Sequence, residues 1–398
     1  MLPIELIIKI VSYLQDRDKL RFLSTCKFLH ECKTHVRFHT RIVADNWYWI
    51  SYYNSFSHII SERTISILPS NVSEIRFGWN FNEPLNHRLK LGIKTIYFDE
   101  HFDQTINGEL PDSLRKLVIK GRFNQRITQM LPTDLEILDL TACNYNHNLD
   151  DVLPENLLEL KLGREFNHEL RFLPCSLKSL FLTKYNYPIK GILPVNLEYL
   201  RLGDDFDHPI TECLPSNLQR IEFGYDFNHS IYNRMPASIT HVSFAYLNSN
   251  LSLKQLPRTV THLKLIFRYD EAVHGPIPAH VTHLTLAEGY DPASTTLSGS
   301  KLTHLRFEYA NYNIRGLPRS LIHLTLGCNY NQSLDNVLHE GLTHLVLGKT
   351  FQQTIVAYIP RTLISLIIEG NYYVADVVKQ QLQYLEIGGV VEKEIIEK

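Results

Sequence analysis

The sequence predicts an α+β protein, in which a small helical head is followed by a parallel-β solenoid of about sixteen coils of 19–22 residues. Two observations predict this fold. A Leu-Pro pair returns at nearly regular intervals from Pro69 to Pro360, with apolar residues at fixed offsets behind it. The residues before this array lack the repeat and place apolar side chains at helical spacing. A period of this length is typical of solenoids.

Composition narrows the class of protein. The 398 residues are 44% hydrophobic and 21% charged, with a net charge of −2, which predicts a soluble folded chain not drawn to nucleic acid or anionic membrane. The six cysteines form no C-x-x-C pair, so buried thiols in a reducing compartment are expected. Glu5 and Lys9 interrupt the N-terminal apolar run, and no segment is long enough to span a membrane. The expected location is intracellular, cytoplasmic or nuclear.

Residues 1–40 predict the helical head. Pro3 is suited to a helix start, and Leu6, Ile10 and Leu14 follow at helical spacing. The polar break QDRDK then precedes a second apolar helix around Leu23. From physics alone this is a helical pair or trio, which would serve as a cap for the exposed edge of the solenoid.

The same residues also resemble an F-box. The resemblance is carried by LPIELIIKIVSYL at 2–14, then Phe22-Leu23 and Thr25-Cys26-Lys27, although Leu29 stands where many F-boxes have Trp. It implies docking on the adaptor subunit of an SCF-type, cullin-based ubiquitin ligase while a C-terminal repeat domain holds a target protein. By this resemblance the adaptor-binding residues are Leu2, Pro3, Leu6, Ile10 and Leu14.

Residues 41–65 fit neither pattern. They are rich in aromatic residues, which predicts a packed junction and N-terminal cap for the first coil; a binding role is the alternative. The aromatics are Trp47, Tyr48, Trp49, Tyr52 and Tyr53.

Residues 66–388 form the repeat array. With the proline of each Leu-Pro pair as position zero, apolar residues fall at +3, +6 and +8, as in Leu135, Leu138 and Leu140. This is L-x-x-L-x-L, the strand segment of a leucine-rich repeat. Positions +6 and +8 share one face of a strand and predict the core. An aromatic near +12 and an Ile or Leu near +16 are expected to line the return arm.

The return arm resembles the FNIP repeat, a relative of leucine-rich repeats, in FNQRI at 123–127, FDHPI at 206–210 and FNHSI at 227–231. The Asn or Asp after the aromatic is expected to hydrogen-bond at the turn and between stacked coils. Glycines recurring at +9, such as Gly163 and Gly224, are interpreted as turn residues and not as a phosphate-binding loop.

Histidine occupies +5 in six consecutive repeats: His241, His262, His283, His304, His323 and His344. Alternation places +5 on the open face of the sheet, with neighbouring imidazoles about 5 Å apart. Mutual repulsion predicts neutral rings at pH 7 and a strongly cationic face near pH 5. No metal site is expected, because a third ring is out of reach and no carboxylate recurs beside the row. Inheritance of the repeat without a role is the alternative.

The +7 row of the same face carries basic residues, including Lys161, Arg201, Lys264 and Arg306. With the histidines they form a candidate partner-binding face that suits an acidic segment; a solvated polar face is the alternative. Enzymatic motifs are absent from the sequence, so no cofactor and no catalytic residue is expected. An enzyme would need the histidines as acid–base groups, with nothing evident to orient a nucleophile.

Residues 389–398 are charged and are expected to cap the last strand against edge pairing. The function predicted by the whole pattern is a non-enzymatic adaptor that brings a target protein to the ubiquitin ligase. The alternative is a repeat scaffold whose helical head is only a cap. The two differ in the head: a cap buries its apolar helix face, whereas a docking head leaves part of it exposed.

Overall fold

The computed structural model describes residues 3–39, 41–43, 50–62, 68–89, 91–248, 250–267, 269–288, 297, 299–309, 311–334, 336–355 and 359–394. The chain divides into two compact units, residues 1–187 (unit 1) and residues 188–398 (unit 2). Leu2, Trp47, Tyr48 and Trp49, which the sequence analysis singled out, lie outside the described residues.

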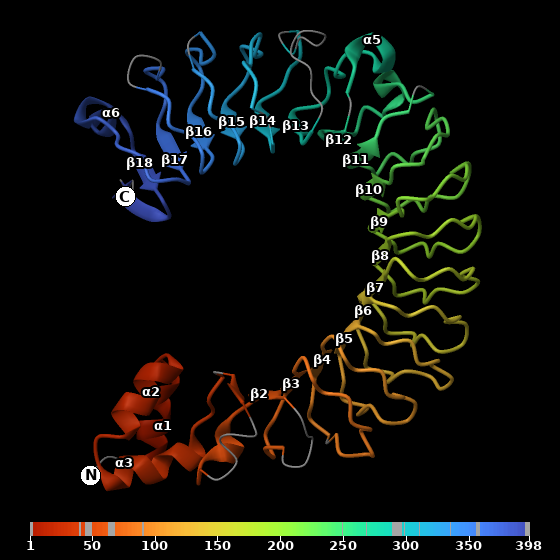
Figure 1. Cartoon of the computed structure of the whole chain (residues 1–398), viewed down its shortest axis with the longest axis vertical. Coiled ribbons are helices and arrows are strands. Elements are labelled where there is room, and N and C mark those ends of the chain that lie inside the picture. Colours follow the sequence, from red (N-terminus) through yellow and green to blue (C-terminus); the bar gives the residue numbers. More distant parts are fainter. Residues whose placement is uncertain are drawn as a thin grey trace. The chain divides into compact units, whose positions relative to one another are not determined.

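Unit 1 begins with three helices, α1 (Ile4–Ser12), α2 (Asp16–Leu23) and α3 (Lys27–Glu31), and a 3-10 turn, η1 (Cys32–His35) (Figure 1). Pro3 precedes α1 with φ of −56°, the angle that its ring imposes. Glu5 lies in the first turn, where the helix dipole favours an acid. The predicted helical head is confirmed.

The head is held together by a small core of its own. Ile7 and Val11 of α1 are buried in a cluster with Leu23, Cys32, Val36, Phe38 and Phe56. Within α2, Lys19 Nζ forms a buried ion pair with Asp16 Oδ1 at 2.7 Å. Asp16 accepts the His39 N–H and Lys19 donates to the Arg37 carbonyl at 3.3 Å, so both residues tie α2 to the chain after η1. The head therefore packs directly onto the segment that leads into the sheet.

That segment already has the geometry of a solenoid coil. Phe38 and Phe56 form an isolated parallel bridge, and β1 (Ile42–Val43) pairs in parallel with β2 (His58–Ser61), which pairs in turn with β3. Tyr53 is buried in the 3-10 turn η2 (Tyr53–Ser55). Strands β1 and β2 were not predicted, because no Leu-Pro pair precedes them.

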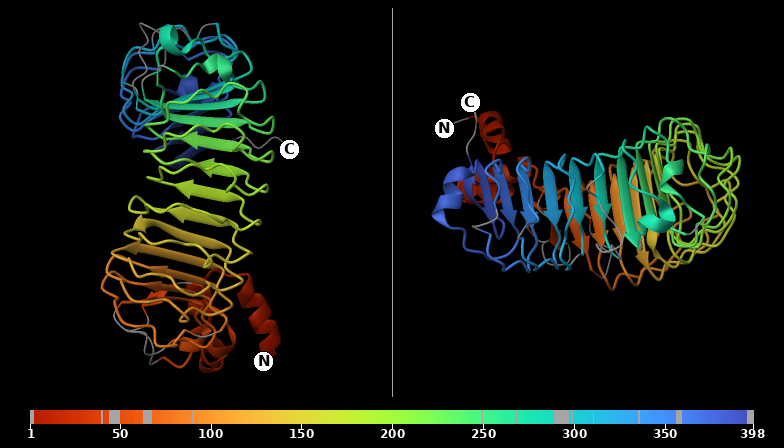
Figure 2. Two further views of the ribbon diagram at one scale, coloured as in Figure 1. Left: turned by 90° about the vertical axis from the view of Figure 1, so that its right-hand side faces the viewer. Right: turned by 90° about the horizontal axis from the view of Figure 1, so that it is seen from above.

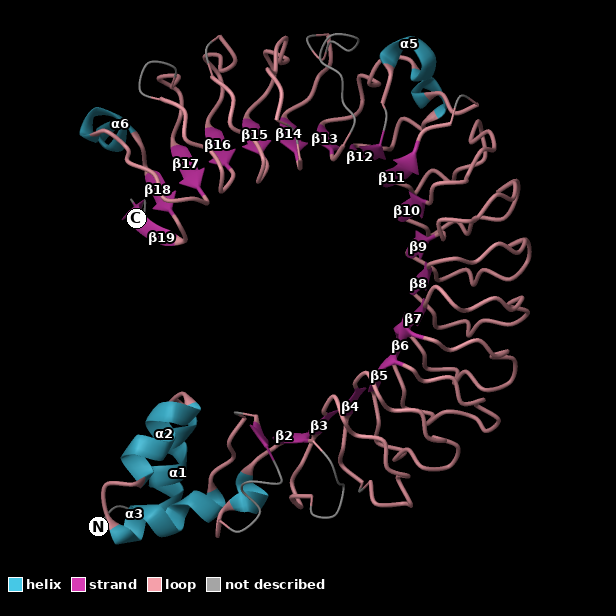
Figure 3. Cartoon of the chain, in the orientation of Figure 1, coloured by secondary structure: helices cyan, strands magenta, loops and turns pink. Residues whose placement is uncertain are grey.

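The rest of unit 1 is a ladder of short parallel strands joined by return arms with little regular structure (Figure 3). The strands are β3 (Glu74–Phe77), β4 (Thr95–Phe98), β5 (Lys116–Gly121), β6 (Ile137–Cys143), β7 (Glu159–Leu162) and β8 (Ser179–Leu182).

Unit 2 continues the same pattern by itself, and Figure 2 shows its strands side by side. They are β9 (Tyr199–Arg201), β10 (Arg220–Phe223), β11 (His241–Tyr246), β12 (His262–Phe267), β13 (His283–Leu286), β14 (His304–Phe307), β15 (His323–Leu326), β16 (His344–Leu347), β17 (Ser365–Ile368), β18 (Tyr384–Ile387) and β19 (Val390–Glu394). The return arms add η3 (Leu253–Gln255), α5 (Glu271–His274) and α6 (Asp376–Gln381). Strand β19 is antiparallel to β18, so the C-terminal segment covers the last edge as a strand.

Each of the sixteen predicted repeats contributes one strand to the described residues, β3 to β18. Most strands alternate between half-exposed +5 and +7 and buried +6 and +8, as predicted. The aromatics near +12 and the aliphatics near +16 are buried as well. In unit 1 the rings stack from coil to coil, with the centroids of Phe102 and Phe123 5.9 Å apart. A coil that cannot bury its own apolar face is thus covered by its neighbours.

Backbone turns explain the Leu-Pro pair. The proline carbonyl at position zero accepts a hydrogen bond from the N–H at +3, as from Leu135 to Pro132 at 3.0 Å. Behind the strands, Oδ1 of the Asn or Asp in several FNIP signatures accepts a backbone N–H from the next coil, as at Asp103, which accepts from the Asn124 N–H at 2.9 Å. The predicted bonding between coils is confirmed, and it explains this row as structural.

The +9 glycines have a different role from the one predicted. Gly163, Gly224, Gly327 and Gly348 do not have positive φ, so turn geometry does not select them. A Cβ at Gly224 would overlap the carbonyl oxygen of Gly203 in the coil before it. Glycine is required there because neighbouring backbones approach too closely for any side chain.

Candidate functional site

Helix α1 carries apolar side chains on two faces. Ile7 and Val11 expose 2% and 0% of their surface, whereas Leu6 and Ile10 expose 48% and 41%. Residues four apart lie on one face of a helix, so Leu6 and Ile10 form an outer stripe that also includes exposed Pro3. The head therefore has a core that does not need Leu6 or Ile10, and these two side chains present aliphatic surface to solvent.

The other predicted adaptor-binding residues are placed differently. Leu14 is half-buried just beyond α1, and Leu2 lies outside the described residues. Tyr13 was not predicted, yet it follows α1 with 80% of its surface exposed. Its position three residues after Ile10 was the signal that could have identified it. The outer α1 stripe consists of Pro3, Leu6, Ile10 and Tyr13.

The six +5 histidines form a continuous stack on the strand face of unit 2, which we call the imidazole row. Neighbouring ring centroids are 4.0–4.1 Å apart and the planes differ by 9–20°. Strand register pairs each histidine with the next, as in His262↔His283. The rings are closer than the predicted separation of about 5 Å, and they are half-exposed.

Burial in this stack lowers the pKa of all six imidazoles, which are His241, His262, His283, His304, His323 and His344. Desolvation is the largest cause throughout, and the pKa falls to about 4 at His283 and His323. Neutral rings at pH 7 follow, as predicted. The expectation of a strongly cationic face near pH 5 is wrong for His283 and His323, because it counted repulsion between charges and omitted desolvation.

The stack does not suit a metal ion. Imidazole lone pairs lie in the ring plane, and nearly parallel rings direct them side by side instead of toward one point. Among the described residues, no group of three or more His, Cys, Asp or Glu side chains could hold a metal ion.

Among the helices that the structure describes, none is long and apolar enough to cross a membrane.

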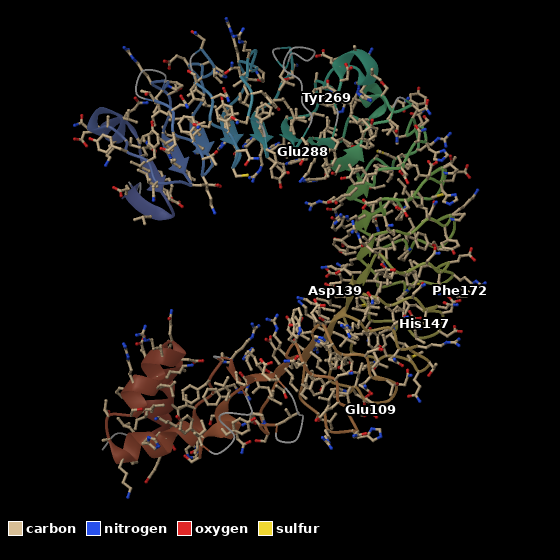
Figure 4. All side chains as sticks on the ribbon, viewed as in Figure 1. Glu109, Asp139, His147, Phe172, Tyr269 and Glu288 are labelled. Carbon is tan, nitrogen blue, oxygen red and sulfur yellow. The ribbon has the colours of Figure 1, made fainter. Side chains whose placement is uncertain are left out.

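The predicted basic residues each have an acidic partner. Lys161 lies 2.9 Å from Glu159 in unit 1, where Figure 4 shows Asp139 on the strand side and His147 and Phe172 on the return arms. In unit 2, Arg201 lies 3.8 Å from Glu222, and Lys264 and Arg306 lie 3.0 and 3.9 Å from Glu308. These pairs offset most of the basic character that the sequence predicted.

A hollow of about 240 Å³ opens where the imidazole row begins, on β10 to β13 of unit 2. It is lined by Arg220, Glu222, His241, Val242, Ser243, His262, Leu263, Lys264, His283 and Thr285. We call it the strand-face hollow. Arg220 and Ser243 were not predicted, although Arg220 occupies +5 in the repeat just before the histidines and could have been found by its offset.

Comparison with protein families finds the F-box domain model at residues 1–41 and the FNIP repeat model at 145–184, 185–226 and 210–246. An FNIP repeat-containing protein of Acanthamoeba polyphaga mimivirus is 31% identical over 98 residues, 24% of this chain. The matched stretch spans 25% of that relative's length.

One similar solved structure supports this fold. CroV588, described as a circular leucine-rich-repeat protein, is similar with a TM-score of 0.52 and 26% identity, covering 91% of this chain and 69% of that one. YopM from Yersinia enterocolitica aligns with a TM-score of 0.35 and 16% identity over 86% of this chain and 87% of its own.

Proposed function

We propose that this chain, an F-box protein with C-terminal FNIP repeats, is a substrate-recognition adaptor of an SCF-type ubiquitin ligase. Its head docks on the adaptor subunit of the ligase through the outer α1 stripe, and its repeats hold a target protein. F-box and leucine-rich-type repeats are interaction modules. The repeats present a long row of half-exposed positions whose residue types vary from coil to coil.

One observation carries the proposal. Leu6 and Ile10 remain exposed although the head has a complete core, built from Ile7 and Val11 on the other side of α1. A helix that served only to seal the first coil would turn both aliphatic faces inward, because exposed Leu and Ile gain nothing from solvent. Two adjacent exposed aliphatics on an ordered helix favour a partner.

The mechanism is proximity. When the chain holds a target beside the ligase, the target meets the ligase within one complex instead of by diffusion. The effective concentration of the target is then about millimolar for a short linkage. We propose no catalytic group in the chain itself. The expected site of action is the cytoplasm or nucleus, which would be that of a host cell if the chain is viral, as its mimivirus relative suggests.

A second function has one observation in its favour. The core of the head includes Phe38 and Phe56, which bridge in the first coil of the sheet, so the head also covers that coil. This suits a repeat scaffold in which the head is only a cap and no ubiquitin chemistry is involved.

Binding of the purified full chain to the SCF adaptor subunit, measured by calorimetry, decides between them. The double variant Leu6→Gln, Ile10→Gln keeps helix propensity and removes the two aliphatic side chains of the stripe. We expect affinity to fall at least about hundredfold, since each buried aliphatic side chain contributes roughly 1.5–3 kcal/mol. Phe172→Gln is the matched control, because Phe172 is 71% exposed on a return arm.

We expect the wild type and the Phe172→Gln control to bind tightly. The double variant should unfold at the same urea concentration as the wild type, which shows that it is folded, and yet fail to bind. Wild-type chain that is folded but does not bind would reduce the head to a cap. Undiminished binding by the double variant would place the docking surface elsewhere.

A further inference from the structure

The strand-face hollow of unit 2 exists because two residues of the +7 row are short. Ser243 and Thr285 stand in a row where Glu222 and Lys264 are long, and the face dips beside His241, His262 and His283. Ser243 is buried to 8% exposure and forms part of the lining. A depression with polar walls therefore lies directly against the edge of three stacked imidazoles.

Each of these three rings is fixed by a threonine that precedes it. Thr240, Thr261 and Thr282 place Oγ1 2.8, 2.9 and 2.9 Å from Nδ1 of the following histidine. The competing acceptor of the Thr282 hydroxyl, the Thr261 carbonyl, is 3.4 Å away and already accepts two backbone N–H groups at 3.0 Å. The shorter distance favours donation of the hydroxyl to Nδ1, with the ring proton on Nε2.

The hollow is thus lined by neutral N–H donors. With Nδ1 occupied, Nε2 is the remaining polar atom of each ring, and it donates to whatever enters. The stacking distance of 4.0 Å repeats the donor from coil to coil. Thr303 and Thr343 also place Oγ1 2.9 and 2.7 Å from Nδ1 of His304 and His344, but each hydroxyl lies 3.2 Å from a carbonyl oxygen of the preceding coil as well.

One positive charge in the hollow has no acid to neutralise it. Among the described residues, no carboxylate lies within ion-pair distance of Arg220, whose guanidinium sits 5.5 Å from the Tyr199 ring. Glu222 is engaged by the Tyr199 hydroxyl at 2.6 Å and by Arg201 at 3.8 Å. Lys264 is paired with Glu308 at 3.0 Å.

We propose that the strand-face hollow binds the carboxylate of an acidic segment of the target protein. Arg220 supplies the charge, and the Nε2–H groups of His241 and His262 supply directed hydrogen bonds. The proposal rests on the repeats being the target-binding part of the chain, and it names the chemistry of the target. His283, the third ring of the hollow, then donates to a further carboxylate or carbonyl oxygen along the segment.

A carboxylate fits better than the other anion that proteins commonly carry. Arg220 is one cation, which matches the single charge of a carboxylate and its two oxygens. A phosphoryl group carries about two charges and favours a cluster of cations. The other cations of the face, Arg201 and Lys264, are already paired.

The test uses the full chain with labelled histidine, followed by NMR of the imidazole nitrogens at neutral pH. The shifts first report which ring nitrogen carries the proton. The probes are acetyl-(Glu-Gly)3-amide, its Gln counterpart and its phosphoserine counterpart. We expect Nε2–H tautomers, and shifts at His241 and His262 on adding the Glu peptide that the Gln peptide does not produce.

Arg220→Gln is expected to lower the affinity for the Glu peptide by about tenfold, which is the effect of losing one hydrogen bond to a charged group. Arg315→Gln is the matched control, because Arg315 is exposed on a return arm of unit 2. Both variants should bind the SCF adaptor subunit as wild type does, which separates this proposal from docking of the head.

Several outcomes would overturn the proposal. Protons on Nδ1 would remove the donor row. Equal shifts with the Glu and Gln peptides would show that charge is not recognised. No shift in a folded chain would show that the hollow does not bind a carboxylate. Tighter binding of the phosphoserine peptide than of the Glu peptide would show that the hollow recognises a phosphoryl group instead.

Discussion

Single residues in this chain are constrained mainly by the coil next to them. Gly224 follows β10, where the backbone passes so close to Gly203 that a Cβ would overlap its carbonyl oxygen. The sequence shows that glycine recurs at this offset but does not explain it. The distance between the backbones of two coils cannot be read from the sequence of either coil. The same holds for Lys264 and Glu308, which are partners across 44 residues.

Gly224→Ala should destabilise unit 2 by about 1–3 kcal/mol, the usual cost of forcing extra atoms into a packed site. The carbonyl cannot move without disturbing the ladder of strands. Gly299→Ala is the control, because a Cβ there meets nothing within 4 Å. Urea unfolding followed by circular dichroism measures both, and similar midpoints for the two variants would contradict the close-approach argument.

At the scale of elements, the repeat made the strands predictable, whereas helical spacing alone did not assign the faces of the head. Alternation at +6 and +8 reports burial directly, because only one face of each strand meets the core. Helix α1 is aliphatic on both sides, so the sequence could not say that Ile7 and Val11 pack inward and Leu6 outward. That choice depends on Phe38 and Phe56, which come later in the chain.

The imidazole row predicts a dependence of stability on pH. The pKa of His283 and His323 is about 4 in the fold, against about 6.5 unfolded, so the unfolded state binds more protons between these values. Their contribution to stability is present above pH of about 6.5 and is lost as pH falls toward about 4. The double variant His283→Gln, His323→Gln should lose less stability over this window.

Urea titrations at several pH values between these limits provide the measurement. His35→Gln is a suitable control, since His35 is exposed in η1 at the far end of the sequence from the row. A double variant with the same pH dependence as wild type would show that the stacked rings titrate as they do in the unfolded chain.

For the molecule as a whole, the repeat explains why so much could be read from sequence. Nearly every contact joins a coil to its neighbours, so a local pattern fixes the fold of each unit. The prediction failed where the chain leaves the repeat. Strands β1 and β2 precede the first Leu-Pro pair, α5 and α6 occupy return arms, and β19 folds back on β18. The hollow was missed because it arises from rows in four adjacent strands.

Strand β19 predicts how the end of the solenoid is protected. Its pairing with β18, with Glu386 opposite Val391, covers the edge of β18 with a strand that carries exposed Glu392. Charged residues on an edge strand oppose pairing with another chain. Val391→Pro removes a backbone N–H and should open the hairpin, so that the edge of β18 becomes available.

The expected result is self-association that rises with protein concentration, measured by sedimentation velocity on the full chain. Val391→Thr is the control, because threonine keeps both the N–H and a preference for strands. If the proline variant sediments as wild type does at every concentration, the pairing of β19 is not what protects this edge. If only the proline variant associates, the protection belongs to the hairpin, because both variants remove the same exposed valine side chain.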